Sequence, residues 1–257
     1  MAKKNGNGLP AELETAFADD SGIGFEEVTT SDLQIPFLRL VQTTSPQLKK
    51  SDASYIKDAS GGDIFNTVTL QSWGGDDGVM VLPIFFQMKL LEFIPRTEGG
   101  GFVRELSVDS QEVRRAVRDQ KTGLELLENG NEVVRSAQHY VKIVHDDGNL
   151  ENAIVDMKKT QLKKSRAWLS LMMMQKHNGK SLPMFATTYR LKSVEESNDK
   201  GDWYNWIVAQ EGRVPSIDAY NDAKEMHGSI SRGELQIAPP VVQDLVEDQT
   251  TDDTIPF

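Results

Sequence analysis

Three patterns in the sequence together predict a mainly β protein with helices, of the α+β class. The first is a set of runs in which apolar and polar residues alternate, bounded by Gly, Pro, Asn and Asp. The second is one long stretch with helical periodicity, and the third is a pair of strand-like runs after it. Strands, one helix and two more strands is the order of a Greek-key barrel of the OB-fold type. We therefore expect an OB-fold-like barrel with an insertion and disordered termini.

Composition divides the chain into an arm, a folded domain and a tail. Residues 1–30 are rich in Gly, Asn, Asp and Glu, which predicts a flexible arm with a short helix around Ala11–Ala18. Residues 31–232 hold the strand and helix patterns, with an insertion at about 96–138 where these patterns weaken. Residues 233–257 contain six acids and no Lys or Arg, which predicts a disordered acidic tail.

Strand-like runs dominate the first half of the predicted domain. Order is expected to begin at Leu33–Gln42, where Pro36 favours the start or the edge of a strand. A Gly-Gly turn then leads into a β-rich run over Ile64–Leu70. The most strongly β-like stretch of the chain is Val79–Ile94.

Alternation within Val79–Ile94 predicts one core face and one open face. The residues assigned to the predicted core face are Ile84, Phe86, Met88, Leu90 and Ile94. The other face mixes Phe85 and Phe93 with Lys89, which is the composition of a wet face on which bases can stack.

The second half of the domain is predicted to contain the helix and the closing strands. A strand resumes at Tyr140–His145, and helical periodicity extends from about Met157 to His177. Asn178–Gly179 is expected to end that helix with a left-handed residue. Further strands are predicted at Leu150–Met157, Met184–Val194 and Asp202–Gln210, and further helices at Gln111–Gln120 and Ser216–His227.

Charge is segregated along the chain. The net charge is -11, of which the six acids of the tail account for more than half and leave -5 for the remainder. Lys158–Lys180 contains seven Lys and Arg residues and no acid. A negative total therefore does not exclude binding to phosphates, although a solvated helix face is the default interpretation of such a run.

Composition excludes several classes of site. The absence of cysteine excludes disulfides, thiolate zinc sites and cysteine nucleophiles. The sequence contains neither a membrane-spanning apolar run nor a signal peptide, so we expect a cytoplasmic protein without a membrane partner. The four histidines stand apart, and no glycine loop precedes a Lys-Ser/Thr pair. We accordingly predict no enzyme, no metal and no cofactor.

The last six residues place an Ile-Pro-Phe tripeptide on an acidic tether. Pro256 restricts the backbone of Ile255, and Phe257 suits an apolar pocket with a basic rim. This Asp-Asp-Thr-Ile-Pro-Phe sequence resembles the C-terminal tip of bacterial single-stranded DNA-binding proteins, which recruits replication and repair enzymes. The resemblance implies a partner-docking site formed by Asp252, Asp253, Ile255, Pro256 and Phe257.

Three scattered blocks, Ile35–Leu38, Gly62–Thr67 and Thr160–Arg166, are similar to a group of phage single-stranded DNA-binding proteins. The resemblance implies a protein of the host cytoplasm that binds and protects single-stranded DNA during replication, recombination or repair. A homo-oligomer is also possible.

The residues themselves predict a cationic stacking platform on the strand faces. On the last strand, Tyr204, Trp206 and Val208 are expected to face the core, which leaves Trp203 as a stacking candidate. The predicted DNA contacts are Phe85, Lys89, Phe93, Tyr140, Lys142, Lys159, Lys163, Arg166, Arg190 and Trp203. Two alternatives stay open: a protein-interaction adaptor that docks on a polymerase or transcription complex, and a nuclease or recombination enzyme with an acidic site that the sequence does not display.

Overall fold

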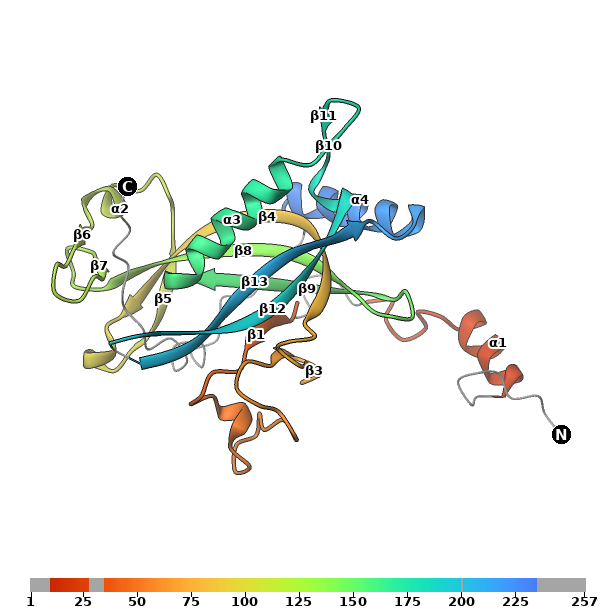
Figure 1. The fold of residues 1–257 in the computed structure, drawn as a ribbon, viewed down its shortest axis with the longest axis horizontal. Coiled ribbons are helices and arrows are strands. Elements are labelled where there is room, and N and C mark those ends of the chain that lie inside the picture. The colour runs from red at the N-terminus through yellow and green to blue at the C-terminus, as the bar shows by residue number, and fades with distance from the viewer. Residues whose placement is uncertain (1–9, 28–34, 200, 235–257) are drawn as a thin grey trace. The chain divides into compact units, whose positions relative to one another are not determined.

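A computed structural model describes residues 10–27, 35–199 and 201–234 (Figure 1). The chain divides into two compact units between Leu33 and Gln34, and each is described by itself. In the first unit, α1 (Ala11–Asp19) forms where the sequence predicts a short helix. The apolar side chains of Leu13 and Phe17 are exposed. Residue 10 and residues 12–27 are all half-buried or exposed, so they contribute no buried core.

The described part of the second unit is mainly β, with three further helices. The helices are α2 (Gln111–Arg115), α3 (Leu162–Met173) and α4 (Ile217–Ser231). The strands are β1 (Phe37–Leu40), β2 (Ile64–Asn66), β3 (Ser72–Trp73), β4 (Val79–Ile94), β5 (Gly101–Leu106), β6 (Val117–Arg118), β7 (Glu125–Leu126), β8 (Glu132–Val144), β9 (Leu150–Lys158), β10 (Lys176–His177), β11 (Lys180–Ser181), β12 (Thr187–Asn198) and β13 (Gly201–Arg213). The predicted α+β class with a majority of strands is confirmed.

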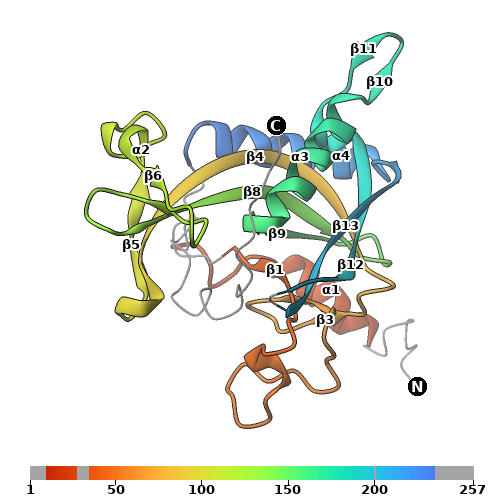
Figure 2. The ribbon, with the colours of Figure 1, turned by 60° about the vertical axis from the view of Figure 1, so that its left-hand side comes forward.

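Eleven of these strands form one curled, mixed sheet that makes a half-barrel (Figure 2). Its path runs β13-β12-β4-β8-β9-β1-β2-β3, and β5 pairs with β4 outside this path. Strands β4, β8 and β9 form an antiparallel meander, and β1 then pairs with β9 in parallel. After α3 the chain returns through β12, which pairs with the start of β4. Within the described residues, β9 therefore has β1 as its second neighbour, and β13 has β12 as its one ladder partner.

A side chain joins β13, at one end of the sheet path, to the segment that follows β1. The Gln42 Nε2 donates to the Tyr204 carbonyl at 3.0 Å, and the Tyr204 N–H donates to the Gln42 Oε1 at 2.8 Å. This amide copies the paired hydrogen bonds that a neighbouring strand would make. Gly62, at φ +90°, lies so close to the Tyr204 ring that a Cβ would stand 2.8 Å from a ring carbon. Glycine is needed there for both reasons.

Both faces of the central strands are covered by helices. On one face, Trp168 and Met172 of α3 pack into a core that contains Val141 and Trp206. The predicted core face of β13 is confirmed, since Tyr204 and Val208 pack against this same cluster. On the other face, α4 supplies Ala223, Met226 and Ile230 to a second core with Leu82, Ile84 and Ile154.

The segment predicted as an insertion is more regular than its sequence pattern suggests. Strand β5 pairs with β4 from Leu90 to Ile94, and β8 begins at Glu132, before the predicted strand start at Tyr140. Helix α2 ends at Arg115 rather than at Gln120, after an N-cap in which the Ser110 Oγ accepts from the Val113 N–H. Pairing with β4 gives these short runs a regularity that their own sequence does not indicate.

The end of the main helix also differs from the prediction. Helix α3 ends at Met173, and Asn178–Gly179 instead forms the two-residue turn of the β10–β11 hairpin. Both turn residues have positive φ, +50° and +77°. A type I′ hairpin turn requires this conformation at both positions, and Asn-Gly is the dipeptide that favours it most.

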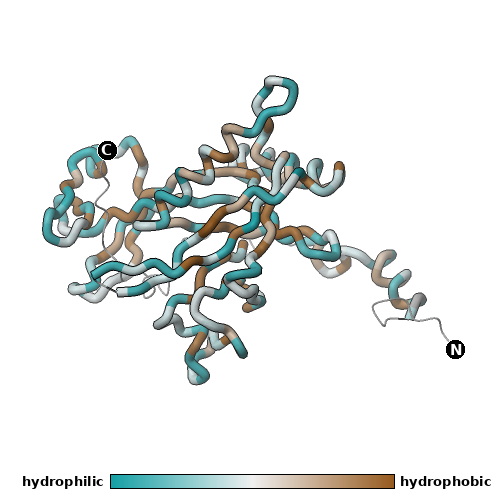
Figure 3. The backbone as a smooth tube through the Cα atoms, viewed as in Figure 1, coloured by the Kyte–Doolittle hydropathy of each residue, from teal (hydrophilic) through white to brown (hydrophobic). Residues whose placement is uncertain are grey.

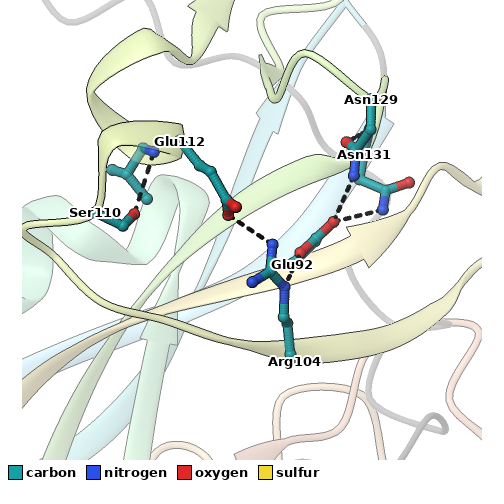
Figure 4. A network of polar contacts seen from close by, with 7 residues as sticks. Glu92, Arg104, Ser110, Glu112, Asn129 and Asn131 are labelled. Atoms are coloured by element: carbon teal, nitrogen blue, oxygen red, sulfur yellow. Dashed lines mark hydrogen bonds and ion pairs between the residues drawn. The ribbon is translucent and has the colours of Figure 1, made fainter.

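A buried carboxylate fastens β5, α2 and the turn before β8 to the end of β4 (Figure 4). The Glu92 side chain accepts from Asn129 Nδ2 at 2.9 Å, Asn131 Nδ2 at 2.6 Å and Arg104 Nε at 2.7 Å. Arg104 also donates to Glu112 at 2.6 Å. Burial raises the pKa of the Glu92 carboxyl, but the donors from Asn131, Asn129 and Arg104 together lower that pKa below its ordinary value of 4.5.

We predict that Glu92→Gln lowers the free energy of unfolding by about 2–3 kcal/mol at neutral pH, because the Arg104 charge then faces an amide. Because the carboxyl pKa is lower in the folded than in the unfolded state, this stabilisation is present above pH 4.5 and is lost as the pH falls through the folded pKa. Urea unfolding at several pH values measures the difference between variant and wild type, which should shrink in acid.

Glu112→Gln is the matched control, because Glu112 contacts the same guanidinium from an exposed position. It should change the unfolding midpoint little. Equal stability of Glu92→Gln and wild type at neutral pH would contradict the structural role of the Glu92 carboxylate.

Candidate nucleic-acid interface

Three of the predicted DNA contacts lie beneath α4 and not on an open face. Tyr140 is 2% exposed, and its ring lies 5.7 Å from that of Phe85, centroid to centroid. The Phe85 ring in turn lies 5.8 Å from the His227 ring of α4. The Lys142 Nζ is 2.6 Å from an Asp222 carboxylate oxygen of the same helix. Burial, with a smaller contribution from the charge of Glu105, raises the pKa of Tyr140 to about 12. The expectation that these side chains share a wet face is wrong, because α4 covers it.

Two more predicted contacts lie where β5 pairs with the end of β4. Phe93 is 2% exposed and packs against Phe102 of β5, with 5.6 Å between ring centroids. The Lys89 Nζ is 2.8 Å from a Glu105 carboxylate oxygen, also on β5. Because the sequence pattern does not reveal β5 as a strand, it gives no sign of the cross-strand partners that Phe93 and Lys89 have on β5. Phe93 belongs to the core instead.

Arg190 and Trp203 lie on the β12–β13 hairpin. The Arg190 guanidinium is 3.0 Å from a Glu211 carboxylate oxygen, and this hydrogen bond raises the Arg190 pKa above its ordinary value. Trp203 is half-buried and pairs across the hairpin with Glu196. Glu196 also forms an ion pair with Lys164 of α3, with 2.8 Å between the Lys164 Nζ and the Glu196 Oε1. These cations are therefore partly neutralised by neighbouring acids.

The remaining predicted contacts follow the start of α3. Lys159 is half-buried in the short 3₁₀ turn that precedes the helix, in the left-handed region at φ +46°. Lys163 and Arg166 are exposed, three residues apart on the outer face of α3. Within the part of the chain that the structure describes, neither has an ion pair with an acid. This is the one pair from the predicted set that the structure brings together as open cations.

The surface around this pair extends beyond the residues that sequence reasoning selected. The run from Met157 to Val194 contains no Asp or Glu, and it contains nine Lys and Arg residues. Its exposed members include Lys176 and Lys180 on the β10–β11 hairpin. Met173 and Met174, which join α3 to this hairpin, are 78% and 72% exposed. We call the set Lys163, Arg166, Met173, Met174, Lys176 and Lys180 the α3 surface.

The signal that would have identified the α3 surface is the length of the acid-free run. The pattern on the helix places Leu162, Ser165, Trp168 and Met172 inward, and leaves the other side to cations and to the methionines at its end. A run of three methionines more often packs in a core. Only Met172 of the three does so here.

Among the described residues, a serine and a histidine, residue types that can act in catalysis, meet in a buried contact. The His139 Nε2 lies 2.8 Å from the Ser165 Oγ, and the ring stacks on Trp168 at 4.4 Å. Burial lowers the His139 pKa to about 3, although the negative charge of Asp156 acts to raise that pKa. Both side chains belong to the core under α3. A search of the described residues finds no group of His, Asp and Glu arranged to hold a metal ion.

These features define the protein's class: it is a curled β half-barrel with an exposed cationic helix. The chain matches the family described as Pam3 phage gp34-like protein over residues 3–236, and it belongs to this family. The family is named for a phage protein, in agreement with the phage origin that the sequence resemblance implies. Comparisons with curated proteins and with solved structures give no match.

Two further sequence predictions concern the C-terminal docking residues and contact with membranes. The predicted docking residues Asp252, Asp253, Ile255, Pro256 and Phe257 lie outside the described residues, and also beyond the segment matched by the family. As for membranes, no helix among the described residues has the length and apolarity needed to cross one.

We predict that Phe93→Ala lowers the free energy of unfolding by about 3–5 kcal/mol, because it leaves a cavity in the cluster formed with Leu91, Val134 and Phe102. Ile94→Ala, at a 37% exposed neighbouring position, is the matched control and should cost far less. Urea unfolding measures both. A Phe93→Ala variant as stable as the control would show that the ring is not part of the core.

Proposed function

We propose that this protein binds and protects single-stranded DNA without strong sequence preference during replication, recombination or repair. We further propose that it recruits partner proteins through the acidic segment ending in Asp252, Asp253, Ile255, Pro256 and Phe257. The observation that carries the DNA proposal is the α3 surface. Its cations stay open in a chain whose net charge is -11, and they lie within a run of 38 residues without one acid.

Charge separation of this kind favours a polyanionic ligand. Binding of a nucleic acid strand gains free energy when lysines and arginines displace the cations condensed on its phosphates. An acidic remainder would repel that strand, so the contact area is restricted to the acid-free surface. Elsewhere in the described chain, cations such as Lys89, Lys142 and Arg190 have carboxylate partners.

The order of the central strands supports an OB-fold-like arrangement. The β4-β8-β9 meander is followed by α3 and by the β12–β13 hairpin, and β12 returns to pair with β4. OB-folds have this order of strands and helix, and several of them bind oligonucleotides. Here the loop between the first two strands of the meander contains β5, α2, β6 and β7.

A protein-interaction adaptor is the second candidate. The burial of Phe93 and Tyr140 favours it, because rings inside the core are not available for stacking on bases. In this alternative the half-barrel contacts a polymerase or transcription complex.

We predict that the protein binds an unstructured oligonucleotide more tightly than a duplex of equal length, and that affinity falls as salt rises. Lys163→Glu/Arg166→Glu should weaken binding by about tenfold or more and reduce the slope of log affinity against log salt by about 1.4, since each lost phosphate contact on a single strand removes about 0.7. Fluorescence anisotropy titrations at several salt concentrations measure both quantities.

Lys49→Glu/Lys50→Glu makes the same charge change at an exposed pair away from α3 and is the matched control. Its binding should fall far less than that of the α3 variant. If the wild type binds single strands no better than duplex, the DNA proposal fails and the adaptor becomes the leading candidate.

The acidic segment should compete with DNA for the α3 surface through charge. Removal of residues 233–257, which carry six acids, should tighten DNA binding, most visibly at low salt where screening is weak. Removal of Phe257 alone should abolish partner recruitment and leave DNA affinity nearly unchanged. Weaker DNA binding after the long truncation would mean that these residues contribute to the fold or to the DNA site.

A further inference from the structure

The β10–β11 hairpin is the part of the α3 surface that lies farthest from the sheet. It follows directly on α3, and it projects beyond the end of that helix in both ribbon views (Figures 1 and 2). All six residues from Lys176 to Ser181 are exposed. The hairpin is drawn mostly in hydrophilic colours, whereas the strands of the sheet mix hydrophilic and hydrophobic colours (Figure 3).

The base of this hairpin is fixed to the fold. The Gln175 Nε2 donates to the Leu171 carbonyl at 3.1 Å and to the Gln210 Oε1 of β13 at 2.8 Å. The Leu182 N–H closes the hairpin on the Gln175 carbonyl at 3.0 Å. The Asn-Gly turn adds a preferred backbone conformation at the tip. A short hairpin that buries nothing itself is thus held at a defined position relative to α3.

The composition of the hairpin and its base is cationic around an apolar pair. Among the described residues of the second unit, Met173 and Met174 are the two most exposed large apolar side chains. Lys176 and Lys180 lie just beyond them on adjacent strands, where His177 pairs with Lys180. Helix α3 ends here with no basic residue in its last turn. The C-terminal end of a helix carries a partial negative charge, so its carbonyls by themselves repel a phosphate. The hairpin lysines Lys176 and Lys180 supply positive charge at this end.

We propose that the hairpin and the methionine pair are the base-contacting end of a single-strand track on the α3 surface. This proposal rests on the proposed function and specifies how the DNA is held. Lys163 and Arg166 contact phosphates along α3, and Lys176 and Lys180 contact phosphates past its end. Met173 and Met174 pack against the unstacked bases between them, because a flexible, polarizable thioether side chain can adapt to any base.

This arrangement fits a single strand better than a duplex. In a duplex the base faces are stacked on one another, so the methionines would meet only groove edges and backbone. In a single strand the apolar base faces are open to contact at little cost in hydrogen bonding. The proposed contact therefore accounts for strand preference without an open aromatic platform.

The test uses the full chain with two probes, an oligo(dT) and an abasic deoxyribose-phosphate strand of equal length. Met173→Ser/Met174→Ser should weaken binding to oligo(dT) by about tenfold and leave both its salt slope and abasic binding unchanged. Lys176→Gln/Lys180→Gln should weaken binding to both probes equally and lower the salt slope by about 1.4. Val108→Ser/Val117→Ser, at positions 58% and 69% exposed, is the apolar control and should change neither.

The outcomes separate this proposal from the proposed function. If the wild type binds oligo(dT) and the methionine variant binds it equally well, the track proposal is overturned, the DNA function stands, and the methionines become a candidate contact for a protein partner. An equal loss on both probes would also overturn it, since the methionines would then act through the phosphate contacts. If the wild type binds neither probe, the DNA function fails first. Thermal unfolding should show all variants folded, because each substituted side chain is exposed.

Discussion

The constraint on which the rest of the structure depends is the coverage of the β4-β8-β9 meander by a helix on each face. Helix α3 brings Trp168 and Met172 to one side, and α4 brings Ala223 and Met226 to the other. With both faces of the central strands occupied, the alternating polar residues of those strands must find partners inside the protein. Lys142 finds Asp222 of α4, and His139 finds Ser165 of α3. A ligand can therefore approach this protein on the outer side of a helix more readily than on the middle of its sheet.

Much of the strand content could be predicted from the sequence, because the long strands are specified locally. Val79–Ile94 is found at the predicted bounds, since sixteen residues of β-rich sequence between a Gly turn and Pro95 leave little alternative. The core face of β13 was likewise predictable, because Tyr204, Trp206 and Val208 share one side of a regular strand. In these cases the local pattern and the tertiary structure agree.

The sites were harder to predict because they depend on elements distant in sequence. Alternation predicts that Ile84 and Phe86 share a face opposite Phe85, which is wrong, because the β4–β8 register shifts between Pro83 and Phe85 and both Ile84 and Phe85 then pack on the α4 side. Alternation also cannot say which side chains become buried. That depends on β5, whose strand character comes from pairing with β4, and on α4, which lies more than a hundred residues further along the chain. The open cations of α3 needed no such information. Their exposure follows from the helical period, and the absence of acids can be counted directly in the sequence.

The closure through Gln42 has a consequence for the motions of the molecule. Neighbouring strands of the meander are joined by continuous ladders, whereas β13 is held to the segment after β1 by the two hydrogen bonds of one side chain. The free energy of a local opening is set by the contacts that break. The contact between Gln42 and β13 should therefore open more often than the ladders of the meander, and without breaking them. The Tyr204 amide should accordingly exchange its hydrogen with solvent sooner than amides inside β4 and β8. Since Gln210 of β13 accepts a hydrogen bond from Gln175, the second residue after α3, the strand that makes this contact also supports the base of the cationic hairpin.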